Sequence, residues 1–118
     1  DFCGPLGVKA QAEAPVDVTA SQPTNVSFEL AWKPGAPGEC RFKAWRVQLR
    51  LQQSDKWSTV KKCGHGDRKV TTCTVRGLKR NSEYRARVSE ICTNPDNNSP
   101  WCELLLPFWT LPGEWVTD

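Results

Sequence analysis

Alternation of apolar and polar side chains is the strongest constraint on how this sequence folds. In residues 45–52, Trp, Val and Leu alternate with Arg and Gln, as in a strand that buries one face. Residues 26–32 and 84–89 repeat the pattern, and shorter strand-like stretches lie at 57–60 and 72–75. Short strands divided by turns predict an all-β fold, either an antiparallel sandwich or a barrel, and no segment predicts a helix.

The last apolar stretch, residues 103–110, has apolar side chains on both faces. Its Pro107 has no backbone N–H to donate to a neighbouring strand, so we expect an edge strand here. At 118 residues, the whole chain suits one domain with a sizeable core rather than two domains.

The composition is ordinary for a soluble globular domain, with 25% charged and 38% hydrophobic residues. No apolar run is long enough to span a membrane, so we expect membrane association only through a parent protein. The first residues lack the basic and apolar segments of a signal peptide. We therefore expect a mature chain or a piece of a longer one.

The cysteines limit both the chemistry that the chain can perform and the cellular compartment in which it can fold. None forms a Cys-x-x-Cys pair and His65 is the one histidine, so we expect no metal and no cofactor. An even number of cysteines predicts three disulfides and an oxidising compartment. The sequons at Asn25 and Asn97, the second weakened by Pro100, agree with an extracellular glycoprotein. The six cysteines are Cys3, Cys40, Cys63, Cys73, Cys92 and Cys102.

Residues 63–67, Cys-Gly-His-Gly-Asp, are the most tempting candidate for an active site. A thiol nucleophile requires a free Cys63, whereas the even cysteine count and the short span to Cys73 predict a disulfide. The glycines and Asp67 suit a turn. The sequence has no paired carboxylates at catalytic spacing, no phosphate loop and no Gly-x-Ser-x-Gly elbow, so we expect no enzymatic activity.

Four segments occur in the order of a fibronectin type III domain, and the chain resembles that family over residues 15–113. The segments are LAWKPG (30–35), AWRVQLRLQQSDKWSTV (44–60), TVRGLKRNSEYRARV (74–88) and FWTLPGE (108–114). The resemblance implies a seven-stranded antiparallel β-sandwich, in which Leu78 packs under a turn and Tyr84 forms the corner before the sixth strand.

The same resemblance assigns the rest of the chain. Trp32 and Trp45 are expected in the core, on the second and third strands. Residues 1–14 are expected to form an N-terminal arm, and residues 114–118 the start of a linker to a following domain.

A narrower resemblance links residues 98–102 to the Trp-Ser-x-Trp-Ser signature of class I cytokine receptors, of which Ser99 and Trp101 match. In those receptors, arginines of the sixth strand stack on the tryptophans of the signature. The resemblance implies a similar ladder here, with Arg50 on the same sheet face. The expected ladder residues are Arg46, Arg85, Arg87 and Trp101.

The sandwich topology that the resemblance implies brings the cysteines and the arm to one end of the molecule. Six cysteines allow 15 pairings. The pairing that demands least chain movement on this topology is Cys3–Cys40, Cys63–Cys73 and Cys92–Cys102.

We expect an extracellular module of a receptor or adhesion protein that contacts a protein ligand or co-receptor through three disulfide-pinned loops: the one with Cys40, the one between Cys63 and Cys73 and, above all, the one between Cys92 and Cys102. Loops on a rigid sandwich commonly carry recognition, and fixing them in advance lowers the entropic cost of binding. The candidate binding residues are Thr93, Asn94, Asp96, Asn97, Asn98 and Trp101. Two alternatives stay open: Trp101 serves only the ladder, or the whole domain is a spacer between neighbouring domains of its chain.

A basic stretch suggests a third function. Residues 61–87 carry a net charge of +7 and the remainder −4. A sulfated glycan could bind at Lys61, Lys62, Arg68 and Lys69. The alternative is a solvated or ladder-forming face. Nucleic acid is disfavoured by the expected compartment and by the lack of an exposed aromatic platform.

Overall fold

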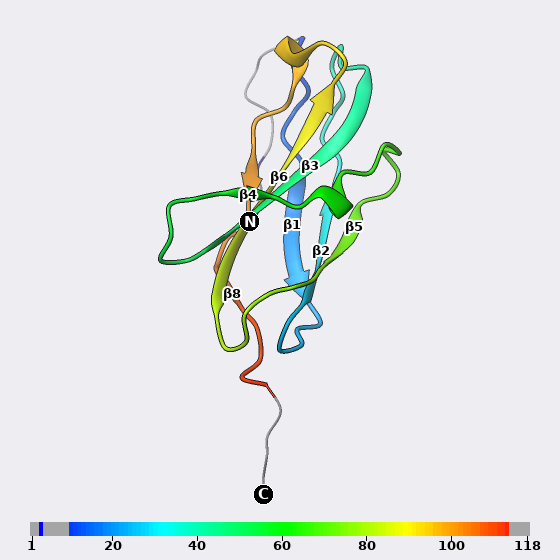
Figure 1. Ribbon diagram of the computed structural model, residues 1–118. Coiled ribbons are helices and arrows are strands. Elements are labelled where there is room, and N and C mark those ends of the chain that lie inside the picture. The colour runs from blue at the N-terminus through cyan, green and yellow to red at the C-terminus, as the bar shows by residue number, and fades with distance from the viewer. Residues whose placement is uncertain (1–2, 4–9, 114–118) are drawn as a thin grey trace, which may run out of the picture.

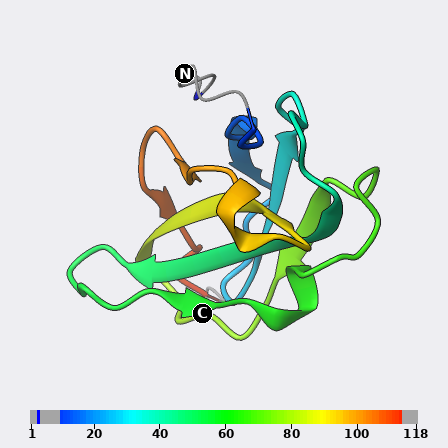
Figure 2. The same cartoon turned by 90° about the horizontal axis from the view of Figure 1, so that it is seen from above.

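Two antiparallel β-sheets pack face to face in the computed structural model, which describes residues 3 and 10–113 (Figure 1, Figure 2). The first sheet has three strands in the order β1-β2-β5. The second has the order β4-β3-β6-β7, and β8 also pairs with β6. The strands are β1 (Val16–Ser21), β2 (Phe28–Lys33), β3 (Phe42–Leu51), β4 (Ser58–Thr59), β5 (Thr72–Val75), β6 (Glu83–Cys92), β7 (Cys102–Glu103) and β8 (Phe108–Trp109).

The expected sandwich is confirmed, with its last strand in two pieces. Strands β7 and β8 are the two ends of the apolar stretch 103–110, and both pair with β6. Pro107 lies in the gap between them, where it cannot donate to a ladder. Two short 3₁₀ turns, η1 (Lys61–Cys63) and η2 (Pro95–Asn97), are the helical segments of the described chain. Neither is long and apolar enough to cross a membrane.

The core is built from the inward-facing residues of β2, β3 and β6, as the alternation predicts. Trp32 and Trp45 are 2% and 1% exposed, and their rings meet edge to face with centroids 5.8 Å apart. The predicted corner is also present, because the backbone N–H of Lys79 donates to the Tyr84 hydroxyl over 2.9 Å. Before it, Gly77 has a φ of 75°, a left-handed conformation that glycine adopts without strain.

A charged residue breaks the apolar pattern of the inner face. Glu90 lies on β6 among inward-facing positions and its side chain is 0% exposed. Arg68 reaches it with two hydrogen bonds, of 3.0 and 3.1 Å, and donates a third of 2.6 Å to the carbonyl of Gly35. One guanidinium therefore neutralises the buried carboxylate and ties the loop after η1 to the loop after β2.

Removing Arg68 should destabilise the domain strongly, because the carboxylate of Glu90 would stay buried without a counter-charge. We expect Arg68→Ala to lower the free energy of unfolding by about 3–5 kcal/mol in urea denaturation. A double variant, Arg68→Met with Glu90→Leu, should recover most of that loss, because neither charge remains. Lys69→Ala, at an exposed neighbour, should change stability by less than about 0.5 kcal/mol. Equal losses in the single and double variants would contradict the charge explanation.

Candidate functional site

The disulfide pairing differs from the expected one at two of three bonds. Cys63–Cys73 forms as predicted, but Cys40 bonds Cys92 and Cys3 bonds Cys102, with Cα–Cα distances of 5.4 and 5.6 Å. Strand register explains the correction. Phe42 lies opposite Cys92, which brings Cys40 to the end of β6.

Cys102 lies too far from Cys92 to bond it. Cys102 is opposite Val88, four residues down β6 from Cys92. Four strand residues span about 13 Å, whereas the Cα atoms of a disulfide lie within about 7 Å of each other. The expected Cys92–Cys102 and Cys3–Cys40 bonds are therefore wrong, although both ends of the loop between Cys92 and Cys102 are cross-linked.

The N-terminal arm fills the space between two loops. Ala12 donates its N–H to Asn97 in the FG loop (93–101), and Glu13 donates to Ala36 in the BC loop (34–41), both over 2.9 Å. Glu39 donates back to the arm at Ala10 over 3.1 Å. Arm residues 10–14, the BC loop and the FG loop therefore form one connected surface at the end of the sandwich that carries η2, which we call the loop pole (Figure 1).

The FG loop uses most of its asparagines to hold its own shape. Asn94 accepts from the N–H of Asp96 over 3.0 Å, and Asn98 accepts from the N–H of Cys92 over 2.7 Å. The amide of Asn97 donates to the carbonyl of Glu39 over 3.3 Å.

The tip of the FG loop is free of such bonds. Thr93, Pro95 and Asp96 are exposed, and their side chains form no hydrogen bond to the described residues. Of the six candidate binding residues, Thr93 and Asp96 have this character. Pro95, the first residue of η2, is also exposed at this tip, and it was not among the candidates from the sequence.

Ser99 joins the FG loop to β6. Its hydroxyl accepts from the N–H of Glu90 over 2.8 Å, and its carbonyl accepts from the Ser89 hydroxyl over 2.9 Å. Ser99 is 7% exposed. The serine that matches the receptor signature therefore extends the pairing of β6 in place of a regular strand.

A ladder of stacked rings and guanidinium groups covers the outer face of the five-stranded sheet. The guanidinium of Arg87 lies between two tryptophan rings, 4.1 Å from the centroid of Trp57 and 4.2 Å from that of Trp101. Arg50 lies 5.0 Å from the Trp57 centroid. Gln48 accepts two hydrogen bonds from Arg87, of 2.9 and 2.6 Å.

Two ladder members differ from those expected. Arg85 forms an ion pair with Glu103 and donates to the carbonyl of Leu104 over 3.1 Å, so its guanidinium is engaged away from Trp101. Arg46 is exposed and lies opposite Ser89. Arg50 and Trp57 complete the ladder instead. The position of Trp57 just before β4, the strand that pairs with Gln48, is the signal that could have identified it.

Partial burial of the Arg87 guanidinium shifts its pKa within the ladder. The pKa of Arg87 is lowered by burial of its guanidinium, raised by the carboxylate of Glu103 and lowered again by Arg50. The faces of Trp57 and Trp101 and the amide oxygen of Gln48 replace the water that this guanidinium loses. The Arg87 guanidinium therefore covers one face of the Trp101 ring.

Arg87→Lys should destabilise the domain even though the charge is kept, because an ammonium cannot stack on two rings and bond Gln48 together. We expect a loss of about 1–3 kcal/mol in the free energy of unfolding. Arg46→Lys, the same substitution at an exposed position on this face, should cost less than about 0.5 kcal/mol. Similar losses in both variants, measured by urea denaturation, would remove the ladder as a stabilising element.

The expected basic patch does not consist of four free side chains. Arg68 is engaged with Glu90 and Gly35. Lys61, Lys62 and Lys69 are exposed, the first two in η1 beside β3. An anion that binds near η1 would therefore contact a different set of cations from the four that the sequence suggested.

The two sheets, their strand order and the tyrosine corner define a β-sandwich module. Residues 13–101 match the fibronectin type III domain family. The chain belongs to this family.

Solved structures share the fold at low identity. A structure described as a myokine is 17% identical, with a TM-score of 0.67, and the match covers 86% of this chain and 99% of that one. Domains A168–A170 of titin are 20% identical, with a TM-score of 0.70 and 86% and 32% coverage. The twitchin kinase region from C. elegans is 19% identical, with a TM-score of 0.70 and 86% and 17% coverage. The match thus spans a minor part of these two multidomain chains.

Proposed function

We propose that this domain is an extracellular protein-recognition module of a receptor or adhesion protein, which binds its partner through the loop pole. One observation carries the proposal: the Cys40–Cys92 disulfide and the hydrogen bonds of the arm join arm residues 10–14, the BC loop and the FG loop into one rigid surface, and the Cys3–Cys102 disulfide anchors the strand that follows the FG loop. A surface fixed before binding loses less conformational entropy when a partner docks.

The cross-links exceed what folding of this domain requires. In the chain-entropy description, closing the 99-residue span of Cys3–Cys102 contributes about 4.7 kcal/mol. The 52-residue span of Cys40–Cys92 contributes about 4.2 kcal/mol. A sandwich of this size with a full core can fold without such help. The Cys40–Cys92 bond lies at the loop pole, and the Cys3–Cys102 bond lies at the start of β7, where the FG loop ends.

The disulfides also support the proposed compartment. All six cysteines are paired, which indicates an oxidising environment. Secretion or display at the cell surface is the commonest such environment, and we place the domain there. Because Cys63 is bonded to Cys73, the segment around His65 has no thiol to act as a nucleophile, and we propose binding rather than catalysis.

A spacer between neighbouring domains is the second candidate. Val26, Trp109 and Leu111 are 46%, 52% and 46% exposed, and a backbone hydrogen bond from Leu111 to Thr24 joins the chain exit to the turn between β1 and β2. Exposed apolar residues at this end suit packing against another domain. The expected linker, residues 114–118, lies outside the described residues.

Charge reversal at the FG tip should abolish partner capture if the loop pole is the binding surface. We expect Thr93→Arg with Asp96→Arg to lose a partner that the native domain retains from secreted and cell-surface proteins, since these side chains are exposed and free of internal bonds. Thr72→Arg with Asp55→Arg makes the same charge change at exposed positions elsewhere and should capture normally.

Each contrary outcome has a defined meaning. Equal capture by the tip variant and the native domain would place the binding surface away from the loop pole. Failure of the native domain to capture any protein would favour the spacer. Urea denaturation of both variants should match the native domain, so that a loss of binding reports the surface and not unfolding.

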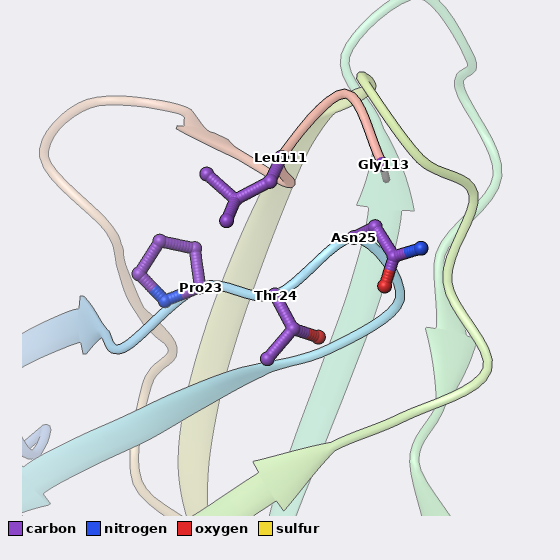
Figure 3. Close-up of a pocket in the computed structure, with 5 residues that line it drawn as sticks. All are labelled: Pro23, Thr24, Asn25, Leu111 and Gly113. Carbon is purple, nitrogen blue, oxygen red and sulfur yellow. The ribbon is translucent and has the colours of Figure 1, made fainter. Parts of the chain in front are cut away.

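The two sequons should differ in use. Asn25 lies in the turn between β1 and β2 and lines a cavity of about 410 Å³ near the chain exit. Figure 3 shows its amide directed away from Pro23 and Leu111. The Asn97 amide instead donates to Glu39, and the Asn97 carbonyl accepts from Ala12. A glycan at Asn97 would separate the FG loop from the BC loop.

We therefore expect N-glycan on Asn25 and none on Asn97 when the domain is secreted from glycosylating cells. Intact mass should drop by one glycan in Asn25→Gln and stay unchanged, apart from the substitution itself, in Asn97→Gln. Glycan found on Asn97 would show that the FG loop tolerates displacement from Glu39. Such a result would weaken the case for a rigid loop pole.

A further inference from the structure

A strip of exposed cations follows β3 and the segment beside it. After β4, residues 60–66 run back along β3: the N–H of Val60 donates to Val47 over 2.8 Å, and the N–H of Trp45 donates to His65 over 3.0 Å. The Cys63–Cys73 bond holds this segment to β5. The cations that it brings together, here called the cationic strip, are Lys43, Arg46, Lys61 and Lys62.

The backbone places these four residues within a small area. Lys43 and Val47 lie four residues apart on β3, which corresponds to about 13 Å, and adjacent chains of a sheet run about 5 Å apart. Lys61 and Lys62 lie in η1, between the contacts at Val60 and His65. The strip is therefore one local concentration of positive charge and not a scatter over the surface.

The four side chains are free to bind an external anion. All are exposed, and none forms an ion pair or hydrogen bond through its side chain with the described residues. The cations of the three ion pairs in the described chain are Lys33, Arg68 and Arg85.

The surroundings of the strip narrow the class of ligand. The large apolar residues exposed in the described chain lie elsewhere, so the strip offers nothing to insert into a lipid bilayer. Trp45, on β3 within the strip, is buried, and Trp57, just before β4, has Arg50 and Arg87 stacked on it, so neither indole presents an open platform for a nucleobase. Ammonium groups on flexible stems suit repeated anionic groups along a chain rather than one shaped ligand.

We propose that the cationic strip binds a sulfated polysaccharide, the polyanion of the oxidising compartment that the disulfides indicate. Lys43 and Arg46 take the places of Arg68, which is committed to Glu90, and of Lys69, which lies beyond the segment 60–66 that runs along β3. The strip lies along the sheet edge and not in the FG loop, so it is a second binding surface, independent of the loop pole.

The test is binding of the oxidised domain to heparin, measured by titration calorimetry at several salt concentrations. We expect Arg46→Gln with Lys61→Gln and Lys62→Gln to lower the affinity at least tenfold at about 0.1 M salt, where exposed charges still attract one another. The variant should also reduce the slope of log affinity against log salt by about 2, because fewer counterions are released.

A matched variant separates the site from overall charge. Arg76→Gln with Lys79→Gln and Arg80→Gln removes three exposed cations at the other end of the sandwich, and both triple variants lower the net charge from +3 to 0. This control should keep most of the heparin affinity. The FG-tip variant Thr93→Arg with Asp96→Arg should also retain it.

Three results would overturn the proposal: no heparin binding by the native domain, equal losses in the two triple variants, or equal affinity for heparin and for polyglutamate of similar length. Equal affinity would show that the strip attracts any polyanion and does not select a sulfated polysaccharide. Unsulfated hyaluronan should bind at least tenfold more weakly than heparin, and equal binding would remove the requirement for sulfate.

Discussion

The pairing of β3 with β6 is the constraint on which the rest of the structure depends. Their register runs from Ala44 opposite Ile91 to Leu51 opposite Tyr84. The inward residues of both strands supply one side of the core, and the outward ones carry most of the Arg/Trp ladder. Side chains alternate between faces with a period of two, so a slip of one residue would exchange core and ladder. The same register brings Cys40 to Cys92, so the Cys40–Cys92 disulfide follows from the backbone pairing of β3 with β6.

Burial of charge is made tolerable in two different ways, each of which involves an arginine. Glu90 is sealed inside the sandwich, and Arg68 neutralises it from a neighbouring loop. Arg87 is itself partly desolvated, and the rings beside it replace water with their negative faces. In both cases the planar guanidinium is what matters, because it binds the Glu90 carboxylate through two hydrogen bonds or stacks between two rings, and the ammonium of lysine has no such planar shape. The outer face is therefore ordered by stacking, while the loop pole is ordered by covalent bonds.

The fold and core could be predicted from sequence, whereas the connections at the loop pole could not. Period-two alternation identified β2, β3 and β6, and the resemblance to fibronectin type III domains placed Trp32 and Trp45 inside correctly. The disulfides depend on how far along β6 the last strand begins, and no pattern in residues 93–101 encodes that distance. The ladder was half predicted, because Arg87 and Trp101 came from a motif while Trp57 required the register of β4. The arm was expected from the sequence, but its contacts were not, because they are hydrogen bonds between backbone groups, which no side-chain pattern encodes.

The two surfaces proposed for this domain differ in the kind of partner that they select. The loop pole is shaped and covalently fixed, so it suits a partner with a complementary surface and depends little on ionic strength. The cationic strip is flexible and charged, so it suits a polyanion and weakens as salt screens it. Both belong to one rigid sandwich and neither uses residues of the other. A polysaccharide held at the strip would therefore raise the local concentration of the domain near a protein partner without blocking the pole, and the combined affinity would exceed either alone.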